Sequence, residues 1–255
     1  MITLKSPREI ELMRDAGKIV GDLLNSFHCL IKPGVTTIEL DRLAEEFIIN
    51  RKAKPAFKGY VAHFKKNYPA TLCTSVNESV VHEIPSNRVL LEGDIVSIDV
   101  GVVYNGYYGD GAYTFAVGEI SMEKKKLITV TLEALYKGIE KAVHSNYLSD
   151  ISNAIQQYVE SQGFTVVHEF TGHGIGTLLH EDPPIPNFGS PHKGPELKTG
   201  MTLAIEPMVN FDTHKVKILP DGWCAVTCDG KPSAHFEHTV AITDGKPLIL
   251  TLPSK

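Results

Sequence analysis

The strongest constraint on the fold is an internal duplication, because the order helix, helix, strands occurs twice along the chain. Segment Gly93–Asp99 (GDIVSID) resembles Gly200–Glu206 (GMTLAIE), and each has a carboxylate six residues after a glycine. Asp110 and Glu237 are each followed, eight residues later, by a further glycine. Two such matches in the same order favour a pseudo-twofold α+β fold.

The spacing of apolar residues predicts the elements of each half. Ser6–Glu9 has the pattern of a capping box with proline at the first helical position, and Lys32–Gly34 ends the helix that it begins. Because no proline- or serine-rich linker divides the chain, we predict one domain over residues 1–255, with halves of about 1–120 and 121–255. The other expected helices begin at Thr36–Glu39 or cover Met122–Val143 and Asp150–Ser161, and the expected strands are Ala70–Val76, Ile95–Val103, Tyr107–Val117, Thr165–His168, Thr202–Val209, Lys215–Leu219, Trp223–Thr227 and Ala234–Thr243.

Charge and cysteine content narrow the compartment and the partners. A net charge of -5 provides no basic field, so general binding of DNA or of a membrane surface is not expected. The charged N-terminal stretch lacks the apolar core of a secretory signal, and no apolar run is long enough to span a membrane. The four cysteines form no C-x-x-C pair, which is typical of reduced thiols. We therefore predict a cytoplasmic protein.

Three strand-like runs each contain a carboxylate: VSIDVGV with Asp99, LAIEPMV with Glu206, and AHFEHTVAI with Glu237. Aspartate and glutamate are poor strand formers and are rarely buried without partners. A single such residue most often faces solvent on a half-exposed strand. Three of them, two in matching positions of the repeat, indicate a buried acidic cluster.

The first hairpin can be read to single residues. Asn105-Gly106 is the strongest short signal for a two-residue type I′ turn. In that register Gly101 pairs with Asp110, and Asp99 pairs with Ala112. Asp99 and Asp110 then lie on one face of the hairpin as diagonal neighbours, about 7–8 Å apart at the backbone. A shift of one residue would move them to opposite faces.

The four carboxylates Asp99, Asp110, Glu206 and Glu237 could not stay ionised together in the interior without neutralisation. No lysine or arginine lies in the strands that carry them, so two divalent cations are the simplest partners. His173, in Thr171–His180 (TGHGIGTLLH), can supply an imidazole. Oxygen ligands with one imidazole suit manganese, iron, cobalt or zinc.

Other catalytic and binding motifs fail on this sequence. TGHGIGTLLH lacks the G-x-x-x-x-G-K-[ST] pattern of a phosphate-binding loop. The three His-Glu pairs do not continue to H-E-x-x-H, and no G-x-S-x-G is present. Cys73 has no local signature of a thiol nucleophile.

Together these residues resemble the type I methionine aminopeptidases, and the resemblance covers nearly the whole chain. It includes the motifs VNESVVHEIP, GDIVSIDVGVVYNGYYGDGAYTF, TGHGIGTLLHEDP, GMTLAIEPMVN, DGWCAVTCDG and AHFEHTVAIT. The family has the α+β "pita-bread" fold, a curved antiparallel sheet with duplicated halves. The resemblance implies a dimetal enzyme that removes the N-terminal methionine of nascent proteins when the second residue is small.

The resemblance also implies a role for each site residue. Asp110 and Glu237 would bridge two metal ions, Asp99 would chelate one, and His173 with Glu206 would complete the other. A bridging water would be the nucleophile, and Glu206 would be the general base. His180 would hydrogen-bond the scissile carbonyl, and His82 would lie near the scissile amide nitrogen. We interpret Gly172, Gly174 and Gly176 as small residues that let His173 and His180 approach from an irregular backbone.

A methionine pocket and a further ion follow from the same resemblance. The pocket would be apolar and polarisable, and any one of its members alone is more often a core residue. One monovalent cation would be bound by the backbone carbonyls of Asn77, Ser79 and Ser233. The expected pocket residues are Phe57, Tyr60, Tyr68, Cys73, Leu179 and Trp223.

Two features depart from the family pattern. Glu83 follows His82 where the family often has glycine, which adds a negative charge near the outgoing peptide. Val61–Asn67 resembles a small insertion at the pocket rim, with an effect on substrate length.

Two other functions remain open. An Xaa-Pro peptidase of the same fold usually carries an additional N-terminal domain, and a non-catalytic pita-bread binding protein typically lacks metal ligands. The expected partners are N-terminal Met peptides of nascent chains, for a monomer whose association with the ribosome stays open.

Overall fold

The structure is a computed structural model, and it describes residues 1–61 and 67–254. Both predicted helix starts are confirmed: Ser6 and Glu9 form one capping box, and Thr36 and Glu39 form another. Each box satisfies backbone N–H groups that the first turn leaves free. The helices are α1 (Pro7–Leu30), α2 (Thr37–Asn50), α3 (Met122–Lys141) and α4 (Leu148–Ser161).

The strands form one large sheet and two small ones. The nine-stranded sheet has the order β1-β4-β5-β14-β9-β7-β8, with β2 paired to β4 and β15 paired to β14. The small sheets have the orders β13-β10-β6 and β11-β12-β3. The strands are β1 (Lys54–Pro55), β2 (Leu72–Val76), β3 (Ser79–Val81), β4 (Ile95–Tyr104), β5 (Tyr107–Ala116), β6 (Thr165–Val166), β7 (Thr171–Gly174), β8 (Glu181–Pro186), β9 (Thr202–Ile205), β10 (Met208–Asn210), β11 (Val216–Ile218), β12 (Ala225–Thr227), β13 (Ser233–His235), β14 (Glu237–Ala241) and β15 (Leu248–Ile249).

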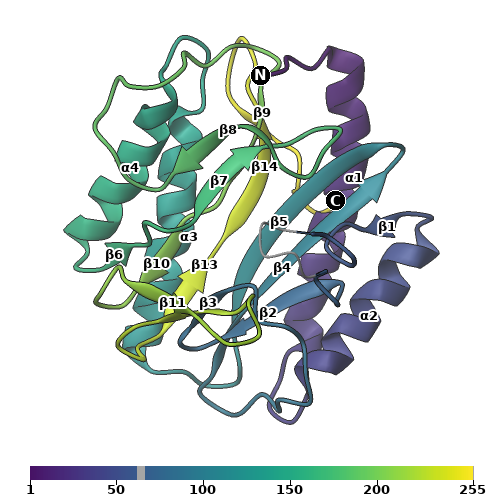
Figure 1. Ribbon diagram of the computed structural model, residues 1–255, viewed down its shortest axis with the longest axis vertical. Coiled ribbons are helices and arrows are strands. Elements are labelled where there is room, and N and C mark those ends of the chain that lie inside the picture. The colour runs from purple at the N-terminus through teal and green to yellow at the C-terminus, as the bar shows by residue number, and fades with distance from the viewer. Residues whose placement is uncertain (62–66, 255) are drawn as a thin grey trace.

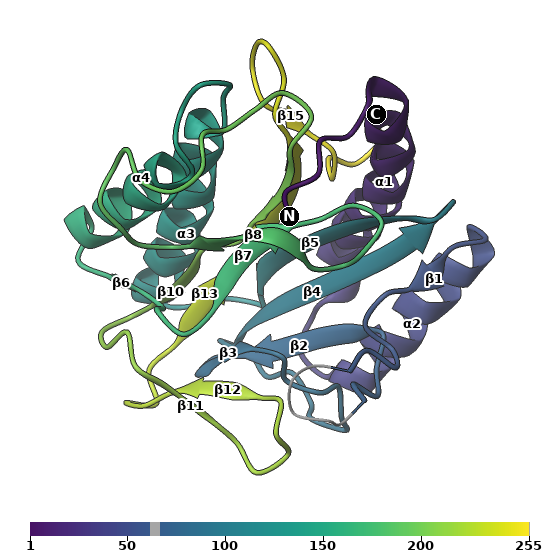
Figure 2. The same ribbon diagram turned by 45° about the horizontal axis from the view of Figure 1, so that its top comes forward.

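Strands of both sequence halves join in the large sheet, where β5 of the first half pairs with β14 of the second. Figure 1 shows α1 and α2 beside the strands of the first half, on the right of the view, and α3 and α4 beside those of the second half, on the left. Each helix pair covers its own apolar core: α1 and α2 pack with β4, and α3 and α4 pack with β9. Figure 2 shows the same separation after a turn of the molecule.

The predicted register of the first hairpin is confirmed. Tyr104 pairs with Tyr107 across the Asn105-Gly106 turn, both of whose residues have positive φ angles of 50° and 82°. Asp99 therefore pairs with Ala112. Positive φ at both turn positions matches the right-handed twist of the flanking strands, which fixes the register.

Two predicted strands are each divided in the structure. The run Thr202–Val209 breaks at Glu206-Pro207 into β9 and β10, and the run Ala234–Thr243 breaks at Phe236 into β13 and β14. Pro207 has no N–H for a ladder, and its carbonyl instead accepts from the Phe236 N–H at 3.4 Å. The two breaks face each other, so the pieces of both strands pass from the large sheet into a small one.

Strands β7 and β8 form a hairpin that we did not predict as strands. The interpretation of Thr171–Gly174 as irregular backbone is wrong, because β7 pairs with both β8 and β9. A register shift between Gly172 and Gly174 interrupts its pairing with β8. High glycine content hid this strand from a propensity argument.

Two sequence features need separate mention. Val61 and Asn67 form an isolated antiparallel bridge at the base of the proposed insertion, whose residues 62–66 lie outside the described residues. In the described ranges, no helix is long and apolar enough to cross a membrane.

Candidate metal centre

One row of paired positions crosses the large sheet and carries acids from both halves of the sequence. Cys73 pairs with Asp99, Asp99 with Ala112, and Ala112 with Glu237. Antiparallel partners point to the same face, so Asp99 and Glu237 face one space across the small side chain of Ala112. Asp110 lies on the same strand as Ala112, two residues away, and therefore faces that space as well.

His173 and Glu206 close this space from the second half. His173 pairs with Ala204 of β9, and Glu206 stands at the break where β9 ends. His173 Nε2 is 3.6 Å from Glu206 Oε1 and 3.9 Å from Asp110 Oδ2. The residues predicted as ligands from five separate positions therefore lie around one space, though their roles stay predictions.

The hydrogen bond of His173 fixes which nitrogen faces the acids. Its Nδ1 lies 2.8 Å from the Gly174 carbonyl oxygen, which can only accept a hydrogen bond. Nδ1 therefore carries the proton, and Nε2 presents its lone pair to the carboxylates. This is the arrangement of a metal-ligating imidazole whose second nitrogen is held by the backbone.

The electrostatics of the cluster disfavour four ionised carboxylates and favour a positive partner. Burial raises the pKa of Asp110 to about 7. Burial, with the neighbouring acidic charges, raises the pKa of Asp99 and of Glu206 well above the usual range of carboxyl groups. Burial and the charges of Asp110 and its neighbours do the same for Glu237. In the described part of the chain, no lysine or arginine forms an ion pair with these four acids.

Orphaned polar atoms show where that partner belongs. Asp99 Oδ1, Glu237 Oε1 and His235 Nε2 are buried without a hydrogen-bond partner among the described residues. An unpaired buried carboxylate oxygen costs several kcal/mol, about as much as other unpaired buried charges. Two groups of side chains bring one ligand atom each within 4.8 Å of one another: Asp110, His173 and Glu237, and Glu206, His235 and Glu237. Oxygen donors with imidazole nitrogen fit divalent cations.

His235 is a candidate residue that sequence reasoning missed. Its side chain is buried, and its Nε2 lies 3.4 Å from Glu206 Oε2. Glu206 thus has an imidazole beside each carboxylate oxygen, His173 at Oε1 and His235 at Oε2. The available signal was the spacing of two residues between His235 and Glu237, which places both on one face of an extended chain.

A cleft of about 990 Å³ opens from the acids to the surface. An apolar cluster distinct from the two main cores forms part of its wall, with Tyr68 and Trp223 in edge-to-face contact at 5.0 Å between ring centroids. The cleft contains every residue that we predicted for the pocket and the site: Phe57, Tyr60, Tyr68, Cys73, His82, Asp99, Asp110, His173, Leu179, His180, Glu206, Trp223 and Glu237.

The two further histidines lie on different parts of the cleft. The His180 ring is tilted against the His173 ring, 4.2 Å between centroids, and its Nδ1 is 2.8 Å from the Tyr60 hydroxyl. His82 contacts Phe170 and Trp223 edge to face. Burial and the nearby His180 lower the pKa of His82 to about 4, and burial also lowers the pKa of His180. Burial therefore favours the neutral form of both imidazoles.

Glu83 does not add a free negative charge to the cleft. Its Oε1 accepts from Arg88 Nη1 at 2.9 Å, and its Oε2 accepts from the Val76 N–H at 2.9 Å. The backbone strain falls one residue earlier, since His82 has a positive φ of 62°. A departure from the family pattern is thus neutralised locally, and the carboxylate turns away from the cleft.

The glycines of TGHGIG make room for neighbouring chain rather than for the imidazoles. A Cβ on Gly172 would stand 2.4 Å from the Ala204 carbonyl oxygen, and one on Gly174 would stand 2.1 Å from that of Asp182. A Cβ on Gly176 would stand 2.4 Å from Lys5 Cε. The first two glycines permit close strand pairing, and the third admits a side chain from the N-terminal segment.

Comparison with known proteins gives one consistent result. The chain matches the model of metallopeptidase family M24 over residues 11–244. It is 57% identical over 252 residues to the methionine aminopeptidase of Clostridium perfringens, with 99% of each chain covered. The crystal structure of methionine aminopeptidase from Rickettsia prowazekii superposes with a TM-score of 0.96 at 40% identity, covering 99% of this chain and 100% of that one. The prolidase from Pyrococcus horikoshii OT3, at 22% identity and a TM-score of 0.79, shares the fold over 99% of this chain and 64% of its own.

Proposed function

The chain belongs to metallopeptidase family M24, and on that premise we propose that it removes the N-terminal methionine from nascent proteins whose second residue is small. The enzyme is a metalloaminopeptidase with the expected pita-bread fold. The single observation that supports this assignment best is the cluster of buried, mutually close acids with His173 at the inner end of an apolar cleft.

The cluster is suited to two divalent cations. Asp99, Asp110, His173, Glu206 and Glu237 would hold them. Their four negative charges are neutralised by two such ions, which is why the pair fits better than a single one. When bound, the ions provide a water of lowered pKa at neutral pH and polarise the scissile carbonyl. Cobalt, manganese, iron and zinc all suit this donor set.

Glu206 is the proposed general base, and its surroundings prepare it for that role. Its carboxylate takes a proton from the attacking water and delivers it to the leaving amine as the peptide bond breaks. The imidazoles of His173 and His235 lie beside its two oxygens, so the carboxylate has little freedom to turn. We propose His235 as a residue that positions Glu206.

His180 and His82 are proposed to bind the reacting peptide unit. The Tyr60 hydroxyl would donate to His180 Nδ1, which favours the tautomer with the proton on Nε2. His180 Nε2–H can then donate to the scissile carbonyl oxygen. His82 would contact the amide nitrogen and the residue that follows it. Neutral imidazoles suit both contacts, and burial lowers the pKa of each of them.

The apolar cluster is the proposed methionine pocket. Phe57, Tyr68, Cys73, Leu179 and Trp223 are buried, and a flexible thioether packs well against aromatic edges. Burial raises the pKa of the Cys73 thiol well above its usual range, so Cys73 lines the pocket as a neutral group. Specificity for a small second residue is proposed to arise in the part of the cleft that His82 lines.

The direct test uses purified protein loaded with manganese or cobalt and the peptide Met-Ala-Ser. We expect release of free methionine, loss of release with EDTA, and recovery when either metal is restored. Asp110→Asn should bind fewer than two ions per chain by elemental analysis. Absence of release with every divalent metal tried would rule out the proposal.

The Xaa-Pro alternative is favoured less. Prolidases share the fold at 22% identity, while the 57% and 40% matches carry the name methionine aminopeptidase. Cleavage before proline without a preference for methionine would favour the Xaa-Pro peptidase over the methionine aminopeptidase. A non-catalytic binding protein would show no bound divalent ion.

The remaining expectations belong to the same proposal. Nascent chains as substrates imply a cytoplasmic enzyme that works as one catalytic domain and as a monomer, and they make association with the ribosome a point to test. The carbonyls of Asn77, Ser79 and Ser233 are kept as a proposed monovalent-cation site. The Ser233 N–H donates to the Asn77 carbonyl at 2.8 Å, so these two residues lie side by side.

A further inference from the structure

The N-terminal segment Thr3–Lys5, here called the strap, crosses the edge of the cleft. Thr3 is part of the cleft wall, and the Lys5 N–H donates to the Gly200 carbonyl at 2.7 Å. Gly200 has a φ of 94°, and a Cβ there would stand 2.7 Å from the Lys5 carbonyl oxygen. The backbone of the strap is therefore seated against the loop before β9, far along the sequence.

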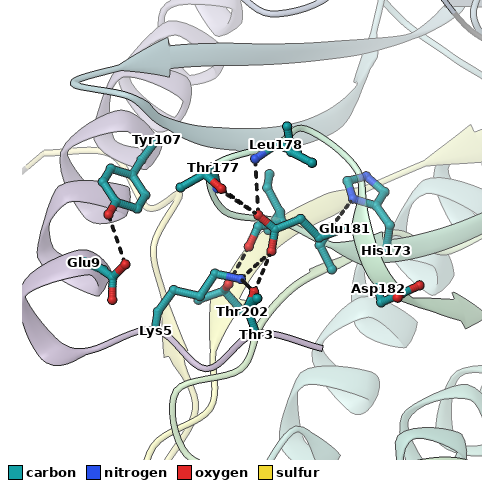
Figure 3. Close-up of polar contacts among 12 residues, drawn as sticks. Thr3, Lys5, Glu9, Tyr107, His173, Thr177, Leu178, Glu181, Asp182 and Thr202 are labelled. Atoms are coloured by element: carbon teal, nitrogen blue, oxygen red, sulfur yellow. Dashed lines mark hydrogen bonds and ion pairs between the residues drawn. The ribbon is translucent and has the colours of Figure 1, made fainter. Parts of the chain in front are cut away.

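The strap ends in a buried ion pair. Lys5 Nζ lies 2.5 Å from Glu181 Oε2, and the two side chains are only 6% and 11% exposed. Thr3 Oγ1 donates to the same Oε2 at 3.0 Å and accepts from Lys5 Nζ at 2.7 Å. Figure 3 shows Lys5 and Thr3 gathered at the Glu181 carboxylate. A pair this well shielded from water is far more strongly coupled than a surface pair.

The other oxygen of the same carboxylate holds the loop that precedes it. Glu181 Oε1 accepts from the Thr177 N–H at 2.8 Å and from the Leu178 N–H at 3.2 Å. Burial alone would raise the pKa of Glu181, but the hydrogen bonds from Lys5 and Leu178 outweigh it and lower the pKa. One carboxylate thus ties the loop to the strap.

That loop carries two residues of the cleft. Leu179 and His180 stand between Leu178 and Glu181, so the anchored atoms lie directly on both sides of them. On its far side the loop is fixed by the Tyr108 N–H, which donates to the Gly176 carbonyl at 2.8 Å. Gly176 is also the position where any Cβ would collide with Lys5. The loop is therefore tied to β5, which bears Asp110, and to the strap.

From these contacts we propose that Lys5 and Glu181 are positioning residues: the strap sets the place of His180 and Leu179 in the cleft. This rests on the proposed function, because it gives His180 a substrate to contact. The imidazole must meet a carbonyl oxygen at hydrogen-bond distance, and a displacement of about 1 Å can cost on the order of a hundredfold in rate. The ion pair acts on the reaction through His180 and touches no reacting atom.

The test compares Lys5→Met with Lys5→Arg in the metal-loaded full chain, with Met-Ala-Ser as substrate. We expect Lys5→Met to lower kcat/KM about tenfold, with a fall in kcat from His180 and a rise in KM from Leu179. Lys5→Arg keeps the charge and should retain most of the activity. Lys231→Met is the matched control, because Lys231 pairs with Asp212 at 2.7 Å on the surface, where both side chains are well exposed.

A second readout separates positioning from a general loss of stability. Backbone amide exchange of residues 177–181 should quicken about tenfold or more in Lys5→Met, while exchange near His82 and the bound metal content stay as in the wild type. Wild-type kinetics and wild-type exchange in Lys5→Met would overturn the inference. So would equal losses in Lys5→Met and Lys5→Arg, since the charge would then be irrelevant.

A replacement variant and a readout that needs no activity cover the cases in which Lys5→Met does not fold or the wild-type protein is inactive. If Lys5→Met does not fold, the double variant Lys5→Met with Glu181→Gln replaces it, since no buried charge is then left unpaired. The same tenfold rise in amide exchange is expected there, and unchanged exchange again overturns the inference. Amide exchange can be measured without turnover. If the wild-type protein released no methionine, the proposed function would be refuted, but the exchange of residues 177–181 would still test whether the strap positions this loop.

Discussion

Two arms of the cleft end in the same dipeptide, His82-Glu83 and His180-Glu181, yet they are held in different ways. Glu83 is tied locally, to Arg88 five residues ahead and to the Val76 N–H seven residues behind. Glu181 is tied to Lys5, 176 residues away. In the local ion pair, the side chains of Glu83 and Arg88 are 16% and 34% exposed. In the distant one, those of Glu181 and Lys5 are 11% and 6% exposed.

The difference shows what each arm depends on. On the His82 arm, the Glu83 carboxylate is held by groups within seven residues of it, although β3 itself pairs with β12 of the second half. The His180 arm is complete only when the N-terminal segment has packed against the second half of the chain. A water-shielded ion pair costs more than an exposed one when one partner is lost, because the other charge is then left buried and unpaired.

The largest expected effect is on stability, from Glu181→Ala compared with Glu83→Ala. Glu181→Ala leaves the buried Lys5 ammonium and two loop N–H groups without their acceptor, and should lower the free energy of unfolding by about 3–5 kcal/mol. Glu83→Ala should cost about 2 kcal/mol, because the Arg88 side chain can turn to water and only the Val76 N–H loses its acceptor. Urea unfolding of both variants measures this, and equal losses would contradict the contrast between the arms.

The next effect is on the pH dependence of stability. Burial and the neighbouring His180 lower the pKa of His82 from about 6.5 in the unfolded chain to about 4. Between these values the unfolded chain binds the proton and the folded chain does not. Neutral His82 therefore contributes at most about 3 kcal/mol to the free energy of unfolding. This contribution is complete above pH 6.5 and is lost as the pH falls towards 4.

Urea unfolding at several pH values checks this, with His82→Gln as the comparison. The variant should lose less stability than the wild type between pH 6.5 and 4.5. A parallel fall in both proteins would show that residue 82 does not carry the dependence.

A smaller effect separates the two tyrosines that support the arms. Tyr60→Phe removes the hydroxyl at His180 Nδ1, and should lower kcat/KM several-fold, for about 1 kcal/mol. Tyr68→Phe removes a hydroxyl that donates to the Leu72 carbonyl at 2.9 Å and to the Glu83 carbonyl at 3.2 Å. This change should lower the free energy of unfolding by about 1 kcal/mol. Steady-state kinetics and urea unfolding of both variants decide whether activity and stability divide in this way.

The smallest effect belongs to the local tie. Arg88→Met should change kcat/KM by less than about threefold, since an ion pair partly open to water contributes below about 1 kcal/mol. The Val76 N–H continues to hold the Glu83 carboxylate. A loss as large as that of Lys5→Met would remove the difference between the arms.

Much of the site could be predicted because short sequence signals have a fixed geometry. The Asn105-Gly106 turn set the register that places Asp99 opposite Ala112, and period-two alternation put Asp110 on the same face. The internal repeat indicated that Glu206 and Glu237 belong with them. His235 escaped because a buried histidine is ordinary in a strand, and only its place beside Glu206 gives it meaning.

The sequence by itself determined the four helices, the first hairpin and the acids that need cations, since these depend on caps, turns and alternation within a few residues. The tertiary structure alone decided that two strand-like runs would break at Glu206-Pro207 and at Phe236 and pass between sheets. It also decided that Lys5 would meet Glu181 across most of the chain. Such contacts form only after loops of many residues have closed, so no local pattern specifies them; packing selects them once the two halves have come together.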